Sequence, residues 1–214
     1  MFKKQRYHIV RFVLGLITAG FIVLSALVVI FPQSFIDVAF SREIQEHQNP
    51  LLDNLMKLVS WFGYSPGCII VVAAAALVFL LFKYRREALF VLLTALAGLV
   101  STLVKILVNR PRPAEPIVHI VGKVSQQSFP SGHVLFYIVY FGFLIVLMYR
   151  LTTIPKIIRV GVSAISLLLI FIIPFSRIYL GAHWFTDVLG GFLLGILCLY
   201  LLCFYYFKKP ANKP

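Results

Sequence analysis

Six long apolar stretches constrain the fold of this 214-residue chain more than any other feature. None of them contains a charged residue, and each has 16 to 20 residues: 12–31, 66–82, 88–104, 134–149, 160–176 and 188–207. At a rise of about 1.5 Å per residue, such a helix with a few flanking residues crosses a hydrocarbon core of about 30 Å. A mean hydropathy of +0.96 agrees with this. The predicted fold class is therefore all-α, a polytopic membrane protein with six transmembrane helices.

The net charge of +13 follows this topology and does not indicate a nucleic-acid site. If the loops alternate across six spans, both termini and the turns 83–87 and 150–159 lie on one side. Thirteen of the twenty basic residues fall on that side, with Glu87 as its single acid. The positive-inside rule makes this side cytoplasmic, where anionic lipid headgroups neutralise the charge. The expected partner is the bilayer, with no nucleic acid.

The first apolar stretch follows Lys3, Lys4 and Arg6, as the core of a cleaved secretory signal does. It is longer than a usual signal core, and no small-x-small cleavage pattern follows it. We therefore expect it to remain as the first transmembrane helix.

The outer segment 32–65 predicts an amphipathic helix. Asn49 followed by Pro50 is typical of a helix start, with an N-cap residue and a proline at the first helical position. Apolar residues then recur at helical spacing between Leu51 and Phe62. We expect this helix to lie at the outer membrane interface, either as a structural strap over the bundle or as a wall of lipid access beside an active site.

Polar groups collect at three helix ends on the predicted outer side, in the blocks KILVNRPRP (105–113), PSGH (130–133) and SRIYLGAHWFTD (176–187). Pro111 and Pro113 forbid continuation of the third span, which must end near Val108 or Asn109. Ser131 is the expected N-cap of the fourth span. The three blocks therefore meet at one membrane depth.

The first two blocks are suited to a phosphate. Lys105 alone could simply snorkel to the interface, but Arg112 follows a proline break and can fold back toward it, and two adjacent cations need an anion between them. In the second block a helix N-terminus, the Ser131 hydroxyl and the close backbone approach at Gly132 favour a bound phosphate. His133, in the first helical turn, is then placed to exchange a proton with a phosphate ester.

The third block supplies a nucleophile candidate. His183 and Asp187 are four residues apart and share a face if the sixth helix starts near Gly181. The carboxylate can then accept a hydrogen bond from one imidazole nitrogen, which leaves the other with a lone pair. Arg177 carries a planar fork suited to two phosphate oxygens. An isolated pair of this kind is usually only an interfacial polar pair, but three blocks at one depth favour a phosphoryl site.

The three blocks resemble, in order and spacing, the signature of the type-2 phosphatidic acid phosphatase superfamily: K-x6-RP, PSGH and SR-x5-H-x3-D. Every defined position is present. The resemblance covers about residues 99–195 of a chain that we expect to form one domain over 1–214. It implies that His183 attacks phosphorus and forms a phosphohistidine, that Asp187 orients it, and that His133 protonates the leaving oxygen. The implied ligands of the phosphoryl oxygens are Lys105, Arg112, Ser131, Gly132 and Arg177.

No metal or cofactor is expected. Asp187 and Glu115 are the only acids after Glu87, so the sequence offers no carboxylate cluster for Mg²⁺, and three cations can take the place of the metal. The expected substrate is a phospholipid or polyprenyl phosphate or diphosphate whose tail stays in the bilayer, at the outer face of a bacterial plasma membrane. The short six-helix layout resembles that of phosphatidylglycerophosphate and undecaprenyl-diphosphate phosphatases, and an outward site slightly favours the diphosphate.

Three alternatives differ in what they require. A lipid A phosphatase or a phosphotransferase would use the same residues, and only its products would distinguish it. A lipid transporter or scramblase should carry ionisable residues at mid-membrane, where this chain has almost none. Vanadium haloperoxidases share the resemblance, but those relatives are soluble or peripheral, unlike this chain.

Overall fold

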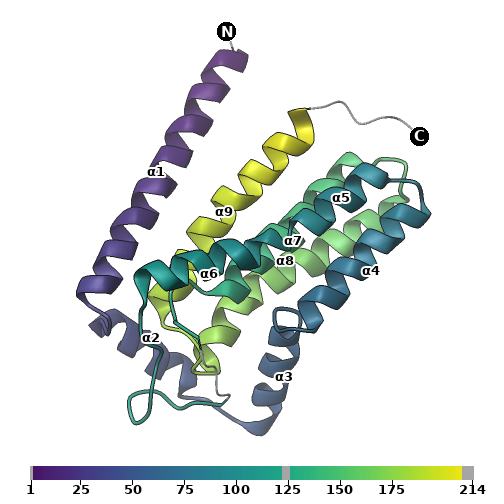
Figure 1. The fold of residues 1–214 in the computed structure, drawn as a ribbon. Helices are drawn as coiled ribbons and strands as arrows, with labels where there is room; N and C mark the ends of the chain where they lie inside the picture. Colours follow the sequence, from purple (N-terminus) through teal and green to yellow (C-terminus); the bar gives the residue numbers. More distant parts are fainter. Residues whose placement is uncertain (1, 122–125, 209–214) are drawn as a thin grey trace.

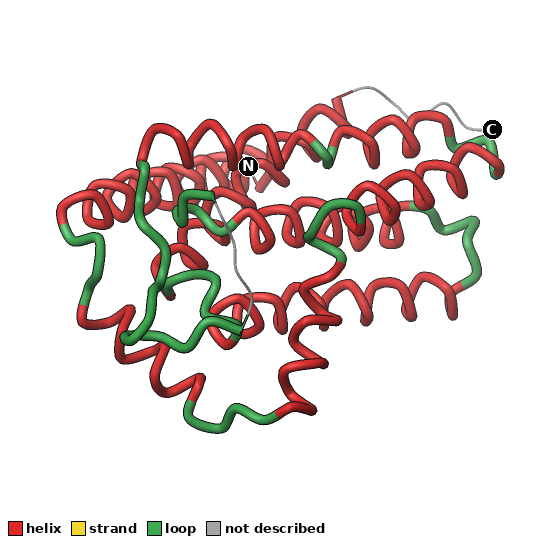
Figure 2. Tube along the Cα trace, turned by 60° about the horizontal axis from the view of Figure 1, so that its bottom comes forward, coloured by secondary structure: helices red, strands yellow, loops and turns green. Residues whose placement is uncertain are grey.

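A computed structural model describes residues 2–121 and 126–208 of the chain, with side chains from residue 8 onward. Over this part the secondary structure is helical, without strands (Figure 2), which confirms the all-α prediction. The helices are α1 (Phe2–Ile30), α2 (Phe35–Gln45), α3 (Pro50–Trp61), α4 (Gly67–Leu81), α5 (Arg85–Leu93), α6 (Leu96–Val108), α7 (Gly132–Arg150), α8 (Lys156–Tyr179) and α9 (Phe185–Lys208).

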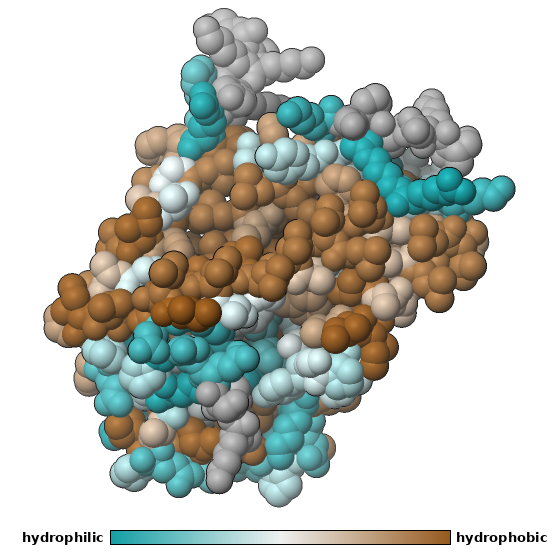
Figure 3. Space-filling model, viewed as in Figure 1, coloured by the Kyte–Doolittle hydropathy of each residue, from teal (hydrophilic) through white to brown (hydrophobic). Residues whose placement is uncertain are grey.

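Five segments of the described chain are long and apolar enough to cross a membrane: His8–Ile30, Arg85–Val108, Gly132–Arg150, Lys156–Tyr179 and Phe185–Lys208. They coincide with five of the six predicted spans. The remaining one contains α4, whose 15 residues extend about 22 Å, so the sixth span stays a prediction. Apolar side chains form a belt between two polar ends (Figure 3), as in an integral membrane protein.

The third predicted span is interrupted in the structure. It consists of α5 and α6, which meet at Thr94 and Ala95, whereas the apolar run alone predicts one continuous helix. The buried Thr94 hydroxyl donates to the Val91 carbonyl (2.5 Å), a local bond that competes with regular helical hydrogen bonding.

Helix α7 is the centre of the molecule and is buried over most of its length between α8 and α9. Small residues bring α9 close to it: a Cβ atom added at Gly191 would lie 2.6 Å from the Ser131 carbonyl oxygen. The Ser131 amide donates to the Asp187 carbonyl (2.9 Å). Close packing of α7 and α9 therefore joins the second and third polar blocks.

The first residues of α1 and the last of α9 lie at one end of the molecule, and α2, α3 and the loop between α6 and α7 lie at the other (Figure 1). Helix α3 begins as predicted, with Asn49 Oδ1 accepting from the Leu52 amide (3.0 Å). The preceding α2 was not separately predicted. Among the basic residues used for the predicted topology, Lys123, Lys209 and Lys213 lie outside the described residues.

Candidate active site

The first polar block folds back on itself. Helix α6 ends at Val108, as predicted. Asn109 follows it in the left-handed conformation (φ 49°), and its amide donates to the Lys105 carbonyl (2.9 Å). The Gln127 carbonyl then accepts from both Lys105 Nζ (2.8 Å) and Arg112 Nη2 (3.3 Å). The predicted approach of Lys105 and Arg112 is confirmed, because the two cations share one acceptor.

The second block starts α7. Ser131 occupies the N-cap position, but its hydroxyl makes no capping hydrogen bond, so the predicted side-chain cap is wrong. The hydroxyl is buried without a partner, and Ser131 packs against Gly191 of α9. His133 lies in the first turn, as predicted, with its Nε2 atom also buried and unpartnered.

The third block differs from the prediction in its helix boundary. Helix α9 begins at Phe185 and not near Gly181, so His183 lies in the preceding turn. Gly181 ends α8 at φ +68°, and a Cβ there would lie 2.2 Å from the His119 carbonyl oxygen, which restricts the turn to glycine. The tight turn, rather than a common helical face, brings His183 to Asp187.

His183 and Asp187 meet without a hydrogen bond. His183 Nδ1 lies 3.5 Å from Asp187 Oδ2, which is too long or too poorly aligned for a bond, and the nitrogen has no other partner. Asp187 Oδ2 already accepts from the Trp184 amide (2.9 Å) and from the Ser128 hydroxyl. The His183 Nε2 atom lies 3.3 Å from Arg112 Nη1.

Arg177 is fixed on one side only. Its Nη1 donates to the Ser60 and Tyr64 hydroxyls, each at 2.9 Å, while Nε and Nη2 are buried without partners. The ring of Tyr64 also meets the ring of His133 edge-on, with centroids 4.4 Å apart. Buried polar groups are normally hydrogen-bonded, so two orphaned donors on one guanidinium indicate a missing acceptor.

Most of the cationic and imidazole side chains described above line a cavity of about 730 Å³. Its polar lining includes Lys105, Arg112, Gly132, His133, Arg177 and His183. Its apolar wall includes Ile69, Val72 and Ala73 of α4, Leu92 of α5, Gly98 of α6 and Phe136 of α7. Of the predicted site residues, Ser131 and Asp187 do not line the cavity and lie behind it. The cavity therefore connects a cationic end to a wall formed by apolar helices.

The charges in the cavity are unbalanced. Three cations and no carboxylate line it among the described residues. Burial, and then the neighbouring Arg177, lower the pKa of Arg112 to about 10, so its guanidinium is still charged at neutral pH. Burial, reinforced by Arg112, Arg177 and Lys105, holds the pKa of His183 well below its ordinary value. A neutral imidazole beside three cations is suited to an anionic, electrophilic ligand.

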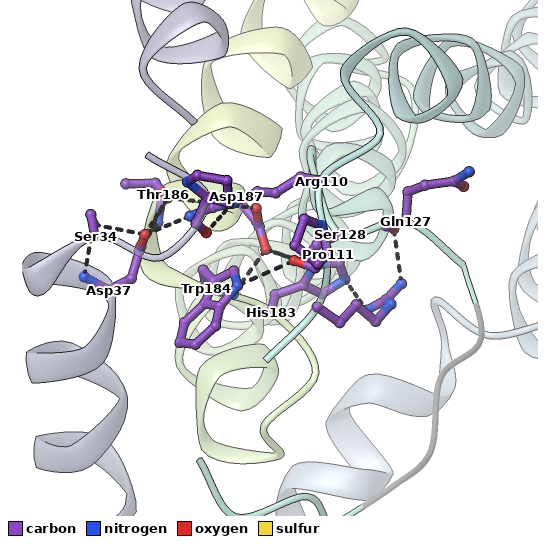
Figure 4. A network of polar contacts seen from close by, with 12 residues as sticks. Ser34, Asp37, Arg110, Pro111, Gln127, Ser128, His183, Trp184, Thr186 and Asp187 are labelled. Atoms are coloured by element: carbon purple, nitrogen blue, oxygen red, sulfur yellow. Dashed lines mark hydrogen bonds and ion pairs between the residues drawn. The ribbon is translucent and has the colours of Figure 1, made fainter. Parts of the chain in front are cut away.

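Sequence reasoning missed the residues that support this site. Arg110 bridges Asp37 and Asp187 (Figure 4), and Ser60 and Tyr64 hold Arg177. The one available signal was the first arginine of RPRP, Arg110, which the K-x6-RP spacing leaves without a role. Nothing in the sequence pairs Asp37 with a residue 150 positions away.

Comparisons with known proteins agree with this geometry. The model of the PAP2 superfamily matches residues 86–211. Phosphatidylglycerophosphatase B of Bacillus subtilis (strain 168) is 32% identical over 78% of this chain and 81% of its own length. The undecaprenyl-diphosphatase of Sulfolobus acidocaldarius is 29% identical over 74% of this chain and 73% of its length.

A solved structure has the same fold. A transmembrane PAP2-type phosphatidylglycerolphosphate phosphatase from Bacillus subtilis superposes with a TM-score of 0.76 at 24% identity, over 94% of this chain and 98% of that one. The family match spans more than half of the chain and includes all three polar blocks. The chain therefore belongs to the PAP2 superfamily, as an integral-membrane lipid phosphatase.

Proposed function

We propose that the protein hydrolyses a lipid phosphate or diphosphate through a phosphohistidine intermediate on His183, without a metal. The observation that carries this proposal is the cavity, in which buried, unpartnered donors of Arg177 and a neutral imidazole face an apolar wall. A phosphate bound at the polar end would satisfy the orphaned donors. A lipid tail attached to that phosphate would lie along the wall of α4, α5 and α6.

In the first step the His183 Nε2 lone pair attacks phosphorus, since Nδ1 faces Asp187 and retains its proton. The bond between phosphorus and the leaving oxygen breaks, and His133 gives that oxygen a proton. The product is a phosphoimidazolium, whose positive charge lies beside the Asp187 carboxylate. Lys105, Arg112, Arg177 and the Gly132 amide stabilise the phosphoryl oxygens during the transfer.

In the second step water attacks the phosphohistidine. His133, now neutral, accepts the proton of the water, the P–N bond breaks, and His183 returns to its neutral form as phosphate leaves. An acceptor other than water would give a phosphotransferase with unchanged residues. Product analysis separates the two: free inorganic phosphate supports hydrolysis, and phosphate found only on a second lipid contradicts it.

The proposed main substrate is phosphatidylglycerophosphate or undecaprenyl diphosphate. Both carry a terminal phosphate on a membrane-held tail, and the names of the two curated relatives refer to these lipids. A panel assay on the purified protein decides between them, with phosphate release measured for each lipid and for lipid A. A preference for lipid A would contradict this assignment while leaving the phosphatase chemistry intact.

The metal-free mechanism has a direct test. Among the described residues, no three His, Cys, Asp or Glu side chains gather as metal ligands. We expect full phosphate release in excess EDTA, and loss of both release and phosphoenzyme labelling in His183→Ala. The matched control is His47→Ala, an exposed histidine of the connection between α2 and α3, which should keep wild-type turnover. Inactivation by EDTA would contradict metal independence, and an active His183→Ala would contradict the nucleophile.

A further inference from the structure

The phosphatase site has a second charged layer, centred on Arg110. This arginine is 2% exposed and does not line the cavity, and all three of its guanidinium nitrogens are engaged. Nε donates to the Pro32 carbonyl (3.0 Å), Nη2 to Asp37 Oδ2 (2.6 Å), and Nη1 to both Thr186 Oγ1 (2.7 Å) and Asp187 Oδ1 (2.6 Å). Unlike Arg177, Arg110 has no guanidinium nitrogen without an acceptor.

Asp37 anchors this layer from outside the family match, which begins at residue 86. It lies in the first turn of α2, where Ser34 Oγ donates to its Oδ2 (2.8 Å). Its Oδ1 accepts from the amide and the hydroxyl of Thr186, at 2.9 and 2.8 Å, so it also caps the start of α9. Figure 4 shows the resulting chain of contacts from α2 through Arg110 to Asp187.

The arrangement fixes both oxygens of Asp187. Oδ1 is held by Arg110, while Oδ2 is held by Trp184 and Ser128 and faces His183 Nδ1. A carboxylate bound at both oxygens cannot rotate, so its distance and angle to the imidazole are set before substrate arrives. Removal of Arg110 would release one of the two oxygens.

Charge adds a second effect. Arg110 paired with Asp187 alone would neutralise the carboxylate beside His183. Asp37 supplies a second negative charge on the same guanidinium, so the three side chains together carry one net negative charge. That charge stays available when His183 becomes positively charged, which occurs in the transition state and the intermediate and not in the substrate complex.

We propose that Asp37 and Arg110 are positioning residues for the reaction, which hold Asp187 in place and keep its negative charge available to His183. The first outer segment then contributes to catalysis as well as to structure. This inference rests on the proposed role of His183 as the nucleophile.

The test is the near-isosteric change Asp37→Asn, which removes one charge without opening a cavity. We expect kcat per folded molecule to fall about tenfold or more, with KM changed less than about twofold, because the interaction strengthens only in the transition state. The fall should be equal for a short-chain lipid phosphate and for soluble p-nitrophenyl phosphate, since both share the scissile phosphate. Arg110→Lys, which keeps a charge but cannot bridge two carboxylates, should retain more kcat than Arg110→Gln.

The control is Asp53→Asn on α3, another hydrogen-bonded outer acid, which accepts from Tyr179 and does not touch Asp187. It should keep wild-type kcat. If Asp37→Asn does not accumulate in folded form, Arg110→Lys decides by the same criterion, because it keeps one positive charge but cannot bridge the two carboxylates. Wild-type kcat in the folded variant, or a loss confined to KM or to the lipid substrate, would overturn the inference.

His183→Ala in the same assay separates this inference from the proposed mechanism. If that variant is inactive while Asp37→Asn matches the wild type, only the role of the second layer is wrong. If His183→Ala retains turnover, the nucleophile itself is misassigned, whatever Asp37→Asn does.

Discussion

His183 is the residue in which burial and charge act most directly together. It is 2% exposed and lines the same cavity as Lys105, Arg112 and Arg177, so protonation would add a fourth positive charge beside these three. The depressed pKa thus has a structural cause that also favours phosphate binding. In the proposed mechanism an arriving phosphate replaces this repulsion by attraction, so that the imidazole can become positively charged during transfer.

The depressed pKa of His183 predicts how stability depends on pH. An unfolded histidine titrates near 6.5, and the folded one does so lower, so below about pH 6.5 the unfolded chain binds a proton that the folded chain does not. This group therefore destabilises the fold as the pH falls, by at most about 1.4 kcal/mol per pH unit. When the pH is lowered from 7.5 to 5.5, we expect the melting temperature of His183→Gln to fall less than that of the wild type.

The exposed His47 provides the control for this measurement, since His47→Gln should keep the full pH dependence. Melting in detergent, without phosphate, is the appropriate assay. Identical pH profiles for His183→Gln and the wild type would show that His183 is not held neutral by the fold.

At the scale of elements, the connection between α3 and α4 holds His133 in place. A Cβ atom added at Gly63 would lie 2.4 Å from His133 Cδ2 and 2.9 Å from its Cγ, so the ring must shift. Because a displacement of about 1 Å can cost up to about 100-fold in rate, we expect Gly63→Ala to lower kcat at least about tenfold. Gly161→Ala in α8 is the matched control, because no atom lies within 4 Å of the added Cβ. Wild-type turnover of Gly63→Ala would contradict this account.

Helix ends were predictable where local chemistry determines them. The end of α6 follows from the prolines after Val108, and the start of α3 from Asn49 and Pro50. The start of α9 was misplaced because the five residues 180–184 between α8 and α9 can form either a helical turn or the tight turn observed. Contact of Gly181 with the 110–121 loop decides between the two. The sequence pattern around residues 180–184 carries no information on that contact.

The same limit applies to the site. Residues at the fixed positions of the motifs, such as Lys105 and Arg112, could be predicted from the sequence, and both line one cavity. The residues that hold the site in place could not be predicted. Asp37 contacts Arg110 and Tyr64 contacts Arg177 only after α2 and α3 pack on α8 and α9. Aspartate and tyrosine are common between apolar stretches and indicate no partner by themselves.

At the scale of the whole molecule, the polar end that carries α2, α3 and the loop between α6 and α7 lies opposite the end that carries the start of α1 and the end of α9 (Figures 1 and 3). The two ends of the described chain therefore lie at the same end of the molecule, which agrees with an even number of membrane crossings. An even number requires that α4 crosses the membrane as well as the five longer segments. We propose this six-span topology, with cytoplasmic termini and an outward-facing site. The basic residues near the termini and in the turns 83–87 and 150–159 support that orientation.

Two cysteine substitutions test the orientation. Glu115, whose side chain is 64% exposed, lies in the loop beside the cavity, and the exposed Lys156 starts α8 at the opposite end. In intact cells we expect a membrane-impermeant maleimide to label Glu115→Cys, and to label Lys156→Cys only after lysis, because the bilayer separates the two positions. The native protein serves as the background control, since Cys68, Cys198 and Cys203 lie in apolar helices. Labelling of Lys156→Cys alone in intact cells would place the site in the cytoplasm, and labelling of both would exclude a crossing between them.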